Sequence, residues 1–338
     1  METEQMTLMD AIVRNSRRKK ASRAVRTPGE IEKLVDWDEL VKVVEVLDKT
    51  KSGKGGRPPI SFKKKLKMLF LQSTFNLSDE ELEDSLIDRL SFQQFVGPGY
   101  DEEIPDFTTV WHFKEALVKH GLMDKIFASI DGQIERRGLI LKKGTMVDAV
   151  ILPSGNRPLS GKKRGELEKE PSSRIDTEAR STKKNGKKHF GYKGHIGVDV
   201  ESKIIRKRAF TPANEHDRSE FENLISGDEK SVWGDKAYPK DAEKRAAREL
   251  GIYYGVLDKG RRGRKLSNRQ QKRNRQRSKV RAAVEHPFAF MKKKLKVSTM
   301  AAKNKLRNAL RFDMSCIVYN VLRTSFLIKR NARLPNCA

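Results

Sequence analysis

The sequence predicts an α/β protein in which an all-α region precedes a mixed five-stranded sheet with helices packed on it. Two observations support this. Apolar residues recur at helical spacing up to about residue 137, and from Gly138 onward short strand-like apolar runs alternate with amphipathic stretches. The chain has 338 residues, which is enough for two domains or for one large core with an accessory module.

The first part of the chain is predicted to consist of short helices that follow a basic arm. Residues 1–29 are basic and poor in large apolar side chains, which is typical of a flexible arm. Residues 30–137 carry helical apolar spacing, with a capping-box pattern at Ser78 and a helix start at Asp106. Such a region suits a helix-turn-helix DNA reader and a dimerisation bundle equally well.

Strands and helices alternate in residues 138–330, the predicted second domain. Three strands in antiparallel succession, followed by strand–helix units, form the ribonuclease-H-like order. Two basic insertions, at 154–187 and 259–279, interrupt it, and the apolar spacing of 304–329 predicts a helix that covers the core. The predicted strands are 145–152, 188–200, 203–210, 231–235 and 252–257, and the helices between them are 217–226 and 239–250.

The composition is typical of a protein that binds nucleic acid. There are 72 Lys and Arg against 45 Asp and Glu, which gives a net charge of +27 and a pI near 10.0. Composition alone leaves a ribosome-associated or merely basic housekeeping protein equally open. The two cysteines, Cys316 and Cys337, form no Cys-x-x-Cys pair, so we expect a reducing cytoplasm and neither a disulfide framework nor a cysteine zinc site. No apolar run approaches the roughly 20 residues that span a membrane.

Three acids stand in settings where a carboxylate is unusual. Asp148 lies inside the apolar stretch 145–152, Asp235 ends the apolar run 231–235, and Glu285 follows a helix-like segment. A buried carboxylate is costly unless it is paired or holds a cation. Each acid alone would be interpreted as a surface or turn residue. Together, on strands that are neighbours in a ribonuclease-H-like sheet and on a helix across it, they predict a site for two Mg²⁺ ions about 4 Å apart that acts on phosphodiesters.

A strongly basic segment leads into the helix that carries Glu285. It has twelve Lys or Arg among the 23 residues from Lys259 to Arg281, and no acid lies between Asp258 and Glu285. A charge run is usually a solvated face or a flexible tail, but its position here favours contact with phosphates. Arg277 and Lys279 are candidate DNA contacts on this segment.

Seven segments match the motifs of one protein family in a fixed order. They are 77–84, 104–110, 144–154, 189–199, 211–217, 232–238 (Val-Trp-Gly-Asp-Lys-Ala-Tyr) and 280–288 (Val-Arg-Ala-Ala-Val-Glu-His-Pro-Phe). The chain thereby resembles the bacterial insertion-sequence transposases of the DDE type, close to the family of insertion sequence five. Each motif alone is weak, whereas the ordered set, which covers roughly residues 40–325, is highly specific.

The resemblance implies roles for individual residues. It makes Asp148, Asp235 and Glu285 the catalytic and metal-binding triad. Related transposases carry a Tyr, Arg, Glu, Lys signature on the last catalytic helix, and here Arg281 lies four residues before Glu285 and Lys292 seven after it. These spacings keep the three side chains on one face of a continuous helix, where the basic pair would hold DNA phosphates. Ser278 stands where the signature has tyrosine, and Pro287 is expected to kink the helix.

The function expected from this resemblance is transposition. The enzyme would cut DNA at the terminal inverted repeats of its element and join the freed 3′-hydroxyl to target DNA, with Mg²⁺ or Mn²⁺ as cofactor. It would act as a homodimer or a higher assembly on DNA, in the bacterial cytoplasm at the nucleoid and without a membrane. A metal-dependent nuclease on the same scaffold, and a non-catalytic DNA-binding protein derived from a transposase, are the alternatives.

Overall fold

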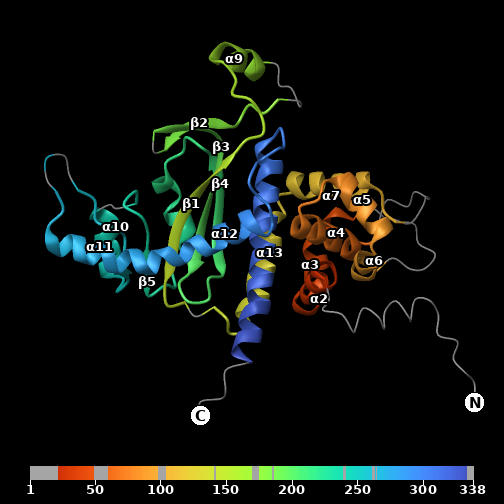
Figure 1. The fold of residues 1–338 in the computed structure, drawn as a ribbon, viewed down its shortest axis with the longest axis horizontal. Coiled ribbons are helices and arrows are strands. Elements are labelled where there is room, and N and C mark those ends of the chain that lie inside the picture. Colours follow the sequence, from red (N-terminus) through yellow and green to blue (C-terminus); the bar gives the residue numbers. More distant parts are fainter. Residues whose placement is uncertain are drawn as a thin grey trace, which may run out of the picture.

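A computed structural model describes residues 22–48, 60–97, 104–140, 142–169, 175–184, 186–238, 241–260, 263 and 265–332. A helical part and a part built on a mixed sheet lie on opposite sides of the long C-terminal helix α13 (Lys305–Asn331) (Figure 1). None of the helices in the described residues has the length and apolar character needed to cross a bilayer.

Side-chain caps set several helix starts in the helical part. Ser78 and Glu81 form the predicted capping box, each accepting a hydrogen bond from the other's backbone N–H. Asp106 accepts from the Thr109 N–H at 2.9 Å, which confirms the predicted helix start there. The elements of this part are α2 (Arg23–Leu34), α3 (Trp37–Val44), the 3₁₀ turn η1 (Glu45–Leu47), α4 (Phe62–Phe75), α5 (Asp79–Asp88), α6 (Leu90–Val96), α7 (Phe107–Lys119) and α8 (Met123–Glu135).

Helix α2 corrects the predicted limit of the basic arm. It begins at Arg23, inside the segment 1–29, and residues 1–21 lie outside the described residues. Thr27 and Pro28 are buried. The Arg23 guanidinium donates to the backbone oxygens of Thr74 at 3.0 Å and of Lys294 at 2.9 Å. Residues 23–29 are therefore packed helix, because their polar and apolar groups find partners that are distant in sequence.

The sheet has the ribonuclease-H-like order. β1 (Thr145–Pro153) pairs antiparallel with β3 (Lys187–Asp199), which pairs antiparallel with β4 (Ile205–Pro212). On the other edge of β1, β5 (Ser231–Trp233) and then β6 (Tyr253–Tyr254) are added in parallel. Both the antiparallel meander and the later parallel strands are confirmed.

The sheet has six strands in the described residues instead of the predicted five. The extra strand, β2 (Arg180–Lys184), lies inside the segment 154–187 and pairs with the first residues of β3. The segment also contains helix α9 (Gly161–Lys169). Its basic, polar composition hid the strand, which is largely exposed and carries no apolar alternation.

Residues 217–226 form two 3₁₀ turns and not the predicted α-helix. These are η3 (Asp217–Glu220) and η4 (Glu222–Leu224). Phe221 and Leu224 are buried in a small cluster under β1 and β5. Because residues three apart are eclipsed in a 3₁₀ helix, this short segment turns both side chains to the same side.

Helix α13 joins the helical part and the sheet part into one core. It packs on α2, α4, α7 and α8, and on β4. Asn320 is fully buried, and its side-chain amide bonds both backbone groups of Ile205, as an adjacent strand would. It accepts from the Ile205 N–H at 2.9 Å and donates to the Ile205 oxygen at 2.7 Å. Phe312 lies directly against Gly194 of β3, where an added Cβ would meet the ring at 2.4 Å. The predicted boundary at 137/138 thus marks a change of secondary structure inside a continuous core.

Candidate active site

Asp148 lies near the middle of β1. It pairs with Ile196 of β3, whose side chain belongs to the core that contains α13. One carboxylate oxygen accepts from the Ala149 N–H at 2.8 Å, and the side chain is 17% exposed. Burial raises the pKa of the Asp148 carboxyl above its ordinary value, and the neighbouring Arg281 opposes this shift. A positive charge beside Asp148 therefore favours the ionised form of its carboxyl against the effect of burial.

Asp235 is brought to Asp148 by the parallel pairing of β1 and β5. Thr145 lies opposite Val232 and Met146 opposite Trp233. The same register continued along both chains sets Asp148 opposite Asp235, just beyond the end of β5. The Asp235 carboxylate accepts from the Lys236 N–H at 2.7 Å. The predicted pairing of the first and fourth predicted strands, β1 and β5, is confirmed. This pairing brings Asp148 and Asp235 close together.

The Arg281 guanidinium lies between the two carboxylates. One of its terminal nitrogens is 3.0 Å from Asp148 Oδ2, and the other is 3.8 Å from Asp235 Oδ1. Burial lowers the pKa of Arg281, but the two carboxylates outweigh burial, so its pKa lies above the ordinary value. A single cation thus offsets the repulsion between two acids that the sheet forces together.

Glu285 lies close to this pair without joining it. It is the first residue of α12 (Glu285–Lys293), its side chain is exposed, and its charge acts on Arg281. In the described part of the chain, no three His, Cys, Asp or Glu side chains are grouped closely enough to hold a metal ion. The sheet therefore assembles two of the three predicted acids, and the third lies beside the cation that bridges them.

The helix that was expected to carry Arg281, Glu285 and Lys292 on one face is broken. Helix α11 (Asn268–Arg281) ends at Arg281, the 3₁₀ turn η5 (Ala282–Val284) follows, and α12 begins at Glu285. Val284 is fully buried, so the turn inserts it into the core. Pro287 lies in the first turn of α12, where a helix needs no N–H, and the interruption at 282–284 falls where its ring was expected to disturb the helix.

The basic candidates fall into two groups. Lys279 and Lys292 are exposed. Arg277 is buried: its guanidinium donates to the Val256 oxygen at 2.7 Å and to the Tyr254 oxygen at 3.2 Å. These two bonds fasten α11 to the sheet edge, and the burial of Arg277 distinguishes it from the exposed lysines as a candidate DNA contact.

Tyr238 is a site residue that sequence reasoning missed. It is fully buried, and its hydroxyl has no hydrogen-bond partner among the described residues. Burial raises the pKa of the Tyr238 hydroxyl, and the charges of Asp217, Asp148 and Asp235 raise it further. Its position three residues after Asp235 could have indicated this role. The Tyr238 N–H donates to the Asp235 backbone oxygen at 3.1 Å and closes the turn that carries Asp235.

Comparison with known proteins assigns both parts of the chain. The family described as "Transposase DDE domain" matches residues 142–321, and the family described as "Transposase domain (DUF772)" matches residues 21–116. Among solved structures, the chain is similar to the piggyBac transposase in a synaptic complex with hairpin DNA, studied by cryo-electron microscopy. That similarity has a TM-score of 0.47 and 10% sequence identity, and covers 93% of this chain and 78% of the other.

Proposed function

The chain belongs to the family of DDE-domain transposases, and from this premise we propose that Asp148, Asp235 and Glu285 form the site at which it cuts and joins DNA. The observation that carries the proposal is the shared guanidinium. Arg281 bridges Asp148 and Asp235, so the fold holds these two acids at one point and requires positive charge between them. Other guanidiniums in the chain are also shared by two acids, as Arg208 is by Asp124 and Asp313, but Asp148 and Asp235 come from neighbouring strands inside the matched transposase domain.

The carboxylates fit the divalent metal ions that the family uses. The guanidinium that lies against both of them is a stand-in cation, and hard carboxylate oxygens are the ligands that Mg²⁺ prefers. Asp148 and Asp235 would hold the metal with Glu285 completing the set, and we assign Mg²⁺, replaceable by Mn²⁺, with two ions per site. When bound, such ions make a water or hydroxyl nucleophilic and stabilise the leaving oxygen.

The protein's own residues do the positioning. Arg281 has one guanidinium, so it can hold the two carboxylates or a DNA phosphate, but not both at full strength. Lys292 lies seven residues after Glu285 in α12, two helical turns on and on the same face. Lys279 is exposed on α11. We assign Lys292 and Lys279 to phosphates of the strand that enters the site, and Arg281 to a phosphate when the metal is bound.

The helical part is assigned to the terminal inverted repeats of the element. The net charge of +27 supplies attraction to DNA, and short capped helices provide the elements that read a groove. The catalytic part would act on the same repeats and on target DNA, in a homodimer or larger assembly formed on DNA at the bacterial nucleoid. In this proposal, the residues up to 137 bind the terminal repeats, and the residues after 137 cut and join the DNA.

The decisive experiment replaces each acid with its amide in the full chain. Asp148→Asn, Asp235→Asn and Glu285→Gln should each abolish cleavage and joining of a duplex that carries the terminal repeats, while repeat binding stays near that of the wild type. Glu249→Gln, at an exposed acid on helix α10 (Asp241–Glu249), is the matched control and should remain active.

The products separate the possible activities. Joined product from the wild type supports transposition, whereas cut product alone would reduce the function to a nuclease, and binding alone to a non-catalytic derivative. Near wild-type cleavage by one of the three amide variants would remove that residue from the site.

A further inference from the structure

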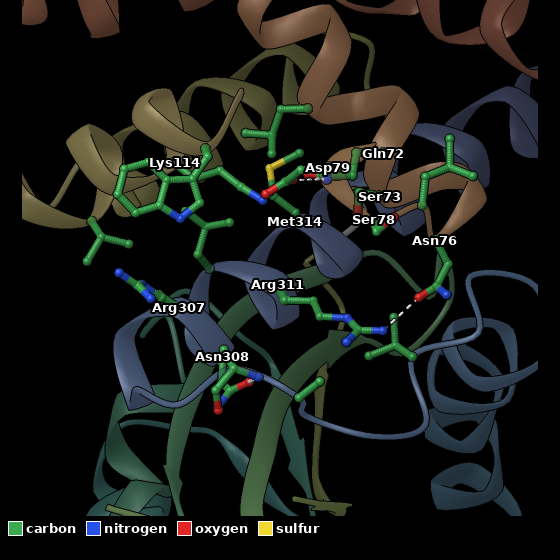
Figure 2. Close-up of a pocket in the computed structure, with 18 of the residues that line it drawn as sticks. Gln72, Ser73, Asn76, Ser78, Asp79, Lys114, Arg307, Asn308, Arg311 and Met314 are labelled. Atoms are coloured by element: carbon green, nitrogen blue, oxygen red, sulfur yellow. Dashed lines mark hydrogen bonds and ion pairs between the residues drawn. The ribbon is translucent and has the colours of Figure 1, made fainter. Parts of the chain in front are cut away.

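A second cleft lies at the junction of the helical part and α13. It has a volume of about 530 Å³ and is lined by α4, α5 and α7 on one side and by α13 and the 297–302 loop on the other (Figure 2). Its walls come from both family regions, residues 21–116 and 142–321. None of the proposed active-site residues lines it.

Most of the charges in this cleft neutralise one another. Lys114 Nζ is 2.5 Å from Asp79, and Arg307 Nε is 2.6 Å from Glu115. Glu81 is held in the capping box of Ser78. The two ion pairs neutralise two of the three acids and two of the three cations of the lining, while the third acid, Glu81, is exposed to solvent.

Arg311 is the cation that remains. It is half-buried, and its guanidinium donates to the side-chain oxygen of Asn76 at 2.7 Å (Figure 2). No carboxylate within the described residues forms an ion pair with it. Burial alone shifts the pKa of Arg311, and it does so downward, which is the behaviour of a cation without a counter-charge. Holding an unpaired guanidinium at a half-buried position costs stability, so an anion from outside the chain would restore the balance.

The remainder of the cleft does not suit a small hydrated anion. Its floor is apolar, formed by Leu69, Leu310 and Met314 among others. Trp111 is 41% exposed at the lining, and the Arg307 guanidinium lies 5.8 Å from its ring centre. An apolar floor with an aromatic ring suits a flat organic group, and the free guanidinium suits a phosphate on the same molecule.

We propose that this cleft binds a single unpaired nucleotide of a DNA strand, with its phosphate on Arg311 and its base in the apolar space beside Trp111. The choice of DNA as the source rests on the proposed function. The cleft itself is tested by binding, with no cleavage involved, so its failure would leave the catalytic proposal intact.

The test is a titration of the full chain, in a metal chelator, that follows tryptophan fluorescence. The probes are dAMP, deoxyadenosine, inorganic phosphate and a five-nucleotide single strand. Because both halves of the ligand contribute, dAMP should bind at least tenfold more tightly than either deoxyadenosine or phosphate. Arg311→Gln should reduce dAMP binding to the level of deoxyadenosine, and Trp111→Phe should remove the fluorescence change. Because a chain of net charge +27 attracts any strand, the single strand is compared between the wild type and Arg311→Gln. Weaker strand binding by the variant identifies a DNA strand as the source, and a loss confined to dAMP identifies a free nucleotide.

The matched control is Arg330→Gln, which removes the same charge from an exposed position of α13 far along the helix from the cleft. It should bind dAMP as the wild type does. Arg311→Gln should also be about as stable as Arg330→Gln, because loss of the bond to Asn76 is offset by removal of a half-buried charge without an ion-pair partner among the described residues. The proposal is overturned if Arg311→Gln is clearly less stable than the control, if phosphate binds as tightly as dAMP, or if an acidic apolar peptide competes equally well.

Discussion

Helices α11 and α13 lie in the same C-terminal third of the chain, and they attach to the protein in opposite ways. Of the 14 residues of α11, all described by the structure, Arg277 is the one that is buried. Of the 27 residues of α13, fifteen are buried, and they include Phe312, Tyr319 and Asn320. In Figure 1, α13 runs through the middle of the molecule, whereas α11 lies at its edge.

The difference shows that α13 stabilises the fold, whereas α11 positions a side chain at the proposed active site. α13 is held by buried side chains, most of them apolar, between Asn308 and Leu327, so the fold depends on it. α11 is held by polar contacts at the sheet edge, chiefly Arg277 with the oxygens of Val256 and Tyr254, and Arg273 with Asp258 at 2.7 Å. Its other cations before Arg281 form no ion pair among the described residues, and its last residue, Arg281, reaches the carboxylates.

The largest expected effect tests α13 as the structural helix. Phe312→Ala removes a fully buried ring that packs on Gly194 and should lower the free energy of unfolding by about 3–5 kcal/mol, measured by denaturant titration. Phe326→Ala, on the same helix at a ring that is 52% exposed, should change it by less than about 0.5 kcal/mol. Similar losses in the two variants would mean that α13 is not the central packing element.

A smaller loss of stability is expected when Arg277, which anchors α11 to the sheet edge, is replaced. Arg277→Gln removes two charge-assisted hydrogen bonds to backbone oxygens and should cost about 2 kcal/mol of unfolding free energy. Arg275→Gln, at an exposed residue two positions earlier, should cost almost nothing. Arg277→Gln should lose no more DNA affinity than Arg275→Gln, because the buried guanidinium is held at the sheet edge. A selective loss of DNA binding in Arg277→Gln would restore it as a DNA contact.

Helix α12 allows the phosphate-holding face to be tested. Lys292→Ala should lower cleavage and strand transfer at least tenfold with little change in repeat binding, because a charge-assisted bond to DNA contributes roughly 1.5–3 kcal/mol. Lys293→Ala, one residue further and about 100° around the helix, should be milder. Both lysines are exposed, so a difference in activity between the two variants reports only the side of the helix on which each lysine lies. Equal activity of the two variants would remove Lys292 from the site.

The smallest expected effect concerns the last residue of α11. Because Arg281 occupies the space between Asp148 and Asp235, a metal ion must displace it, so Arg281→Gln should bind Mg²⁺ about fivefold more tightly in the absence of DNA, or about 1 kcal/mol. Isothermal titration measures this. Lys279→Gln, which removes one charge from an exposed position two residues earlier, should shift the affinity much less. Weaker binding in Arg281→Gln would show that Arg281 organises the carboxylates and does not compete for them.

Much of the fold could be predicted because its signals are local. Helical apolar spacing and the caps at Ser78 and Asp106 act within one or two turns, and the strand order follows from elements met one after another along the chain. The strand β2 and the 3₁₀ turns at 217–224 were missed, since a basic edge strand and a short anchored turn leave no periodic pattern.

The sequence by itself determined the order of the sheet, because its strands and helices follow one another along the chain in that order, and this order places Asp148 and Asp235 on neighbouring strands. Only the tertiary structure decided the roles of the basic residues on α11. Arg275, Arg277 and Arg281 are the same residue type on one basic run, yet one is exposed, one donates to the sheet edge and one bridges two acids. Helix direction and the break at 282–284, which lies just before Pro287 and places Val284 in the core, made that difference, and neither is encoded in the spacing of charges.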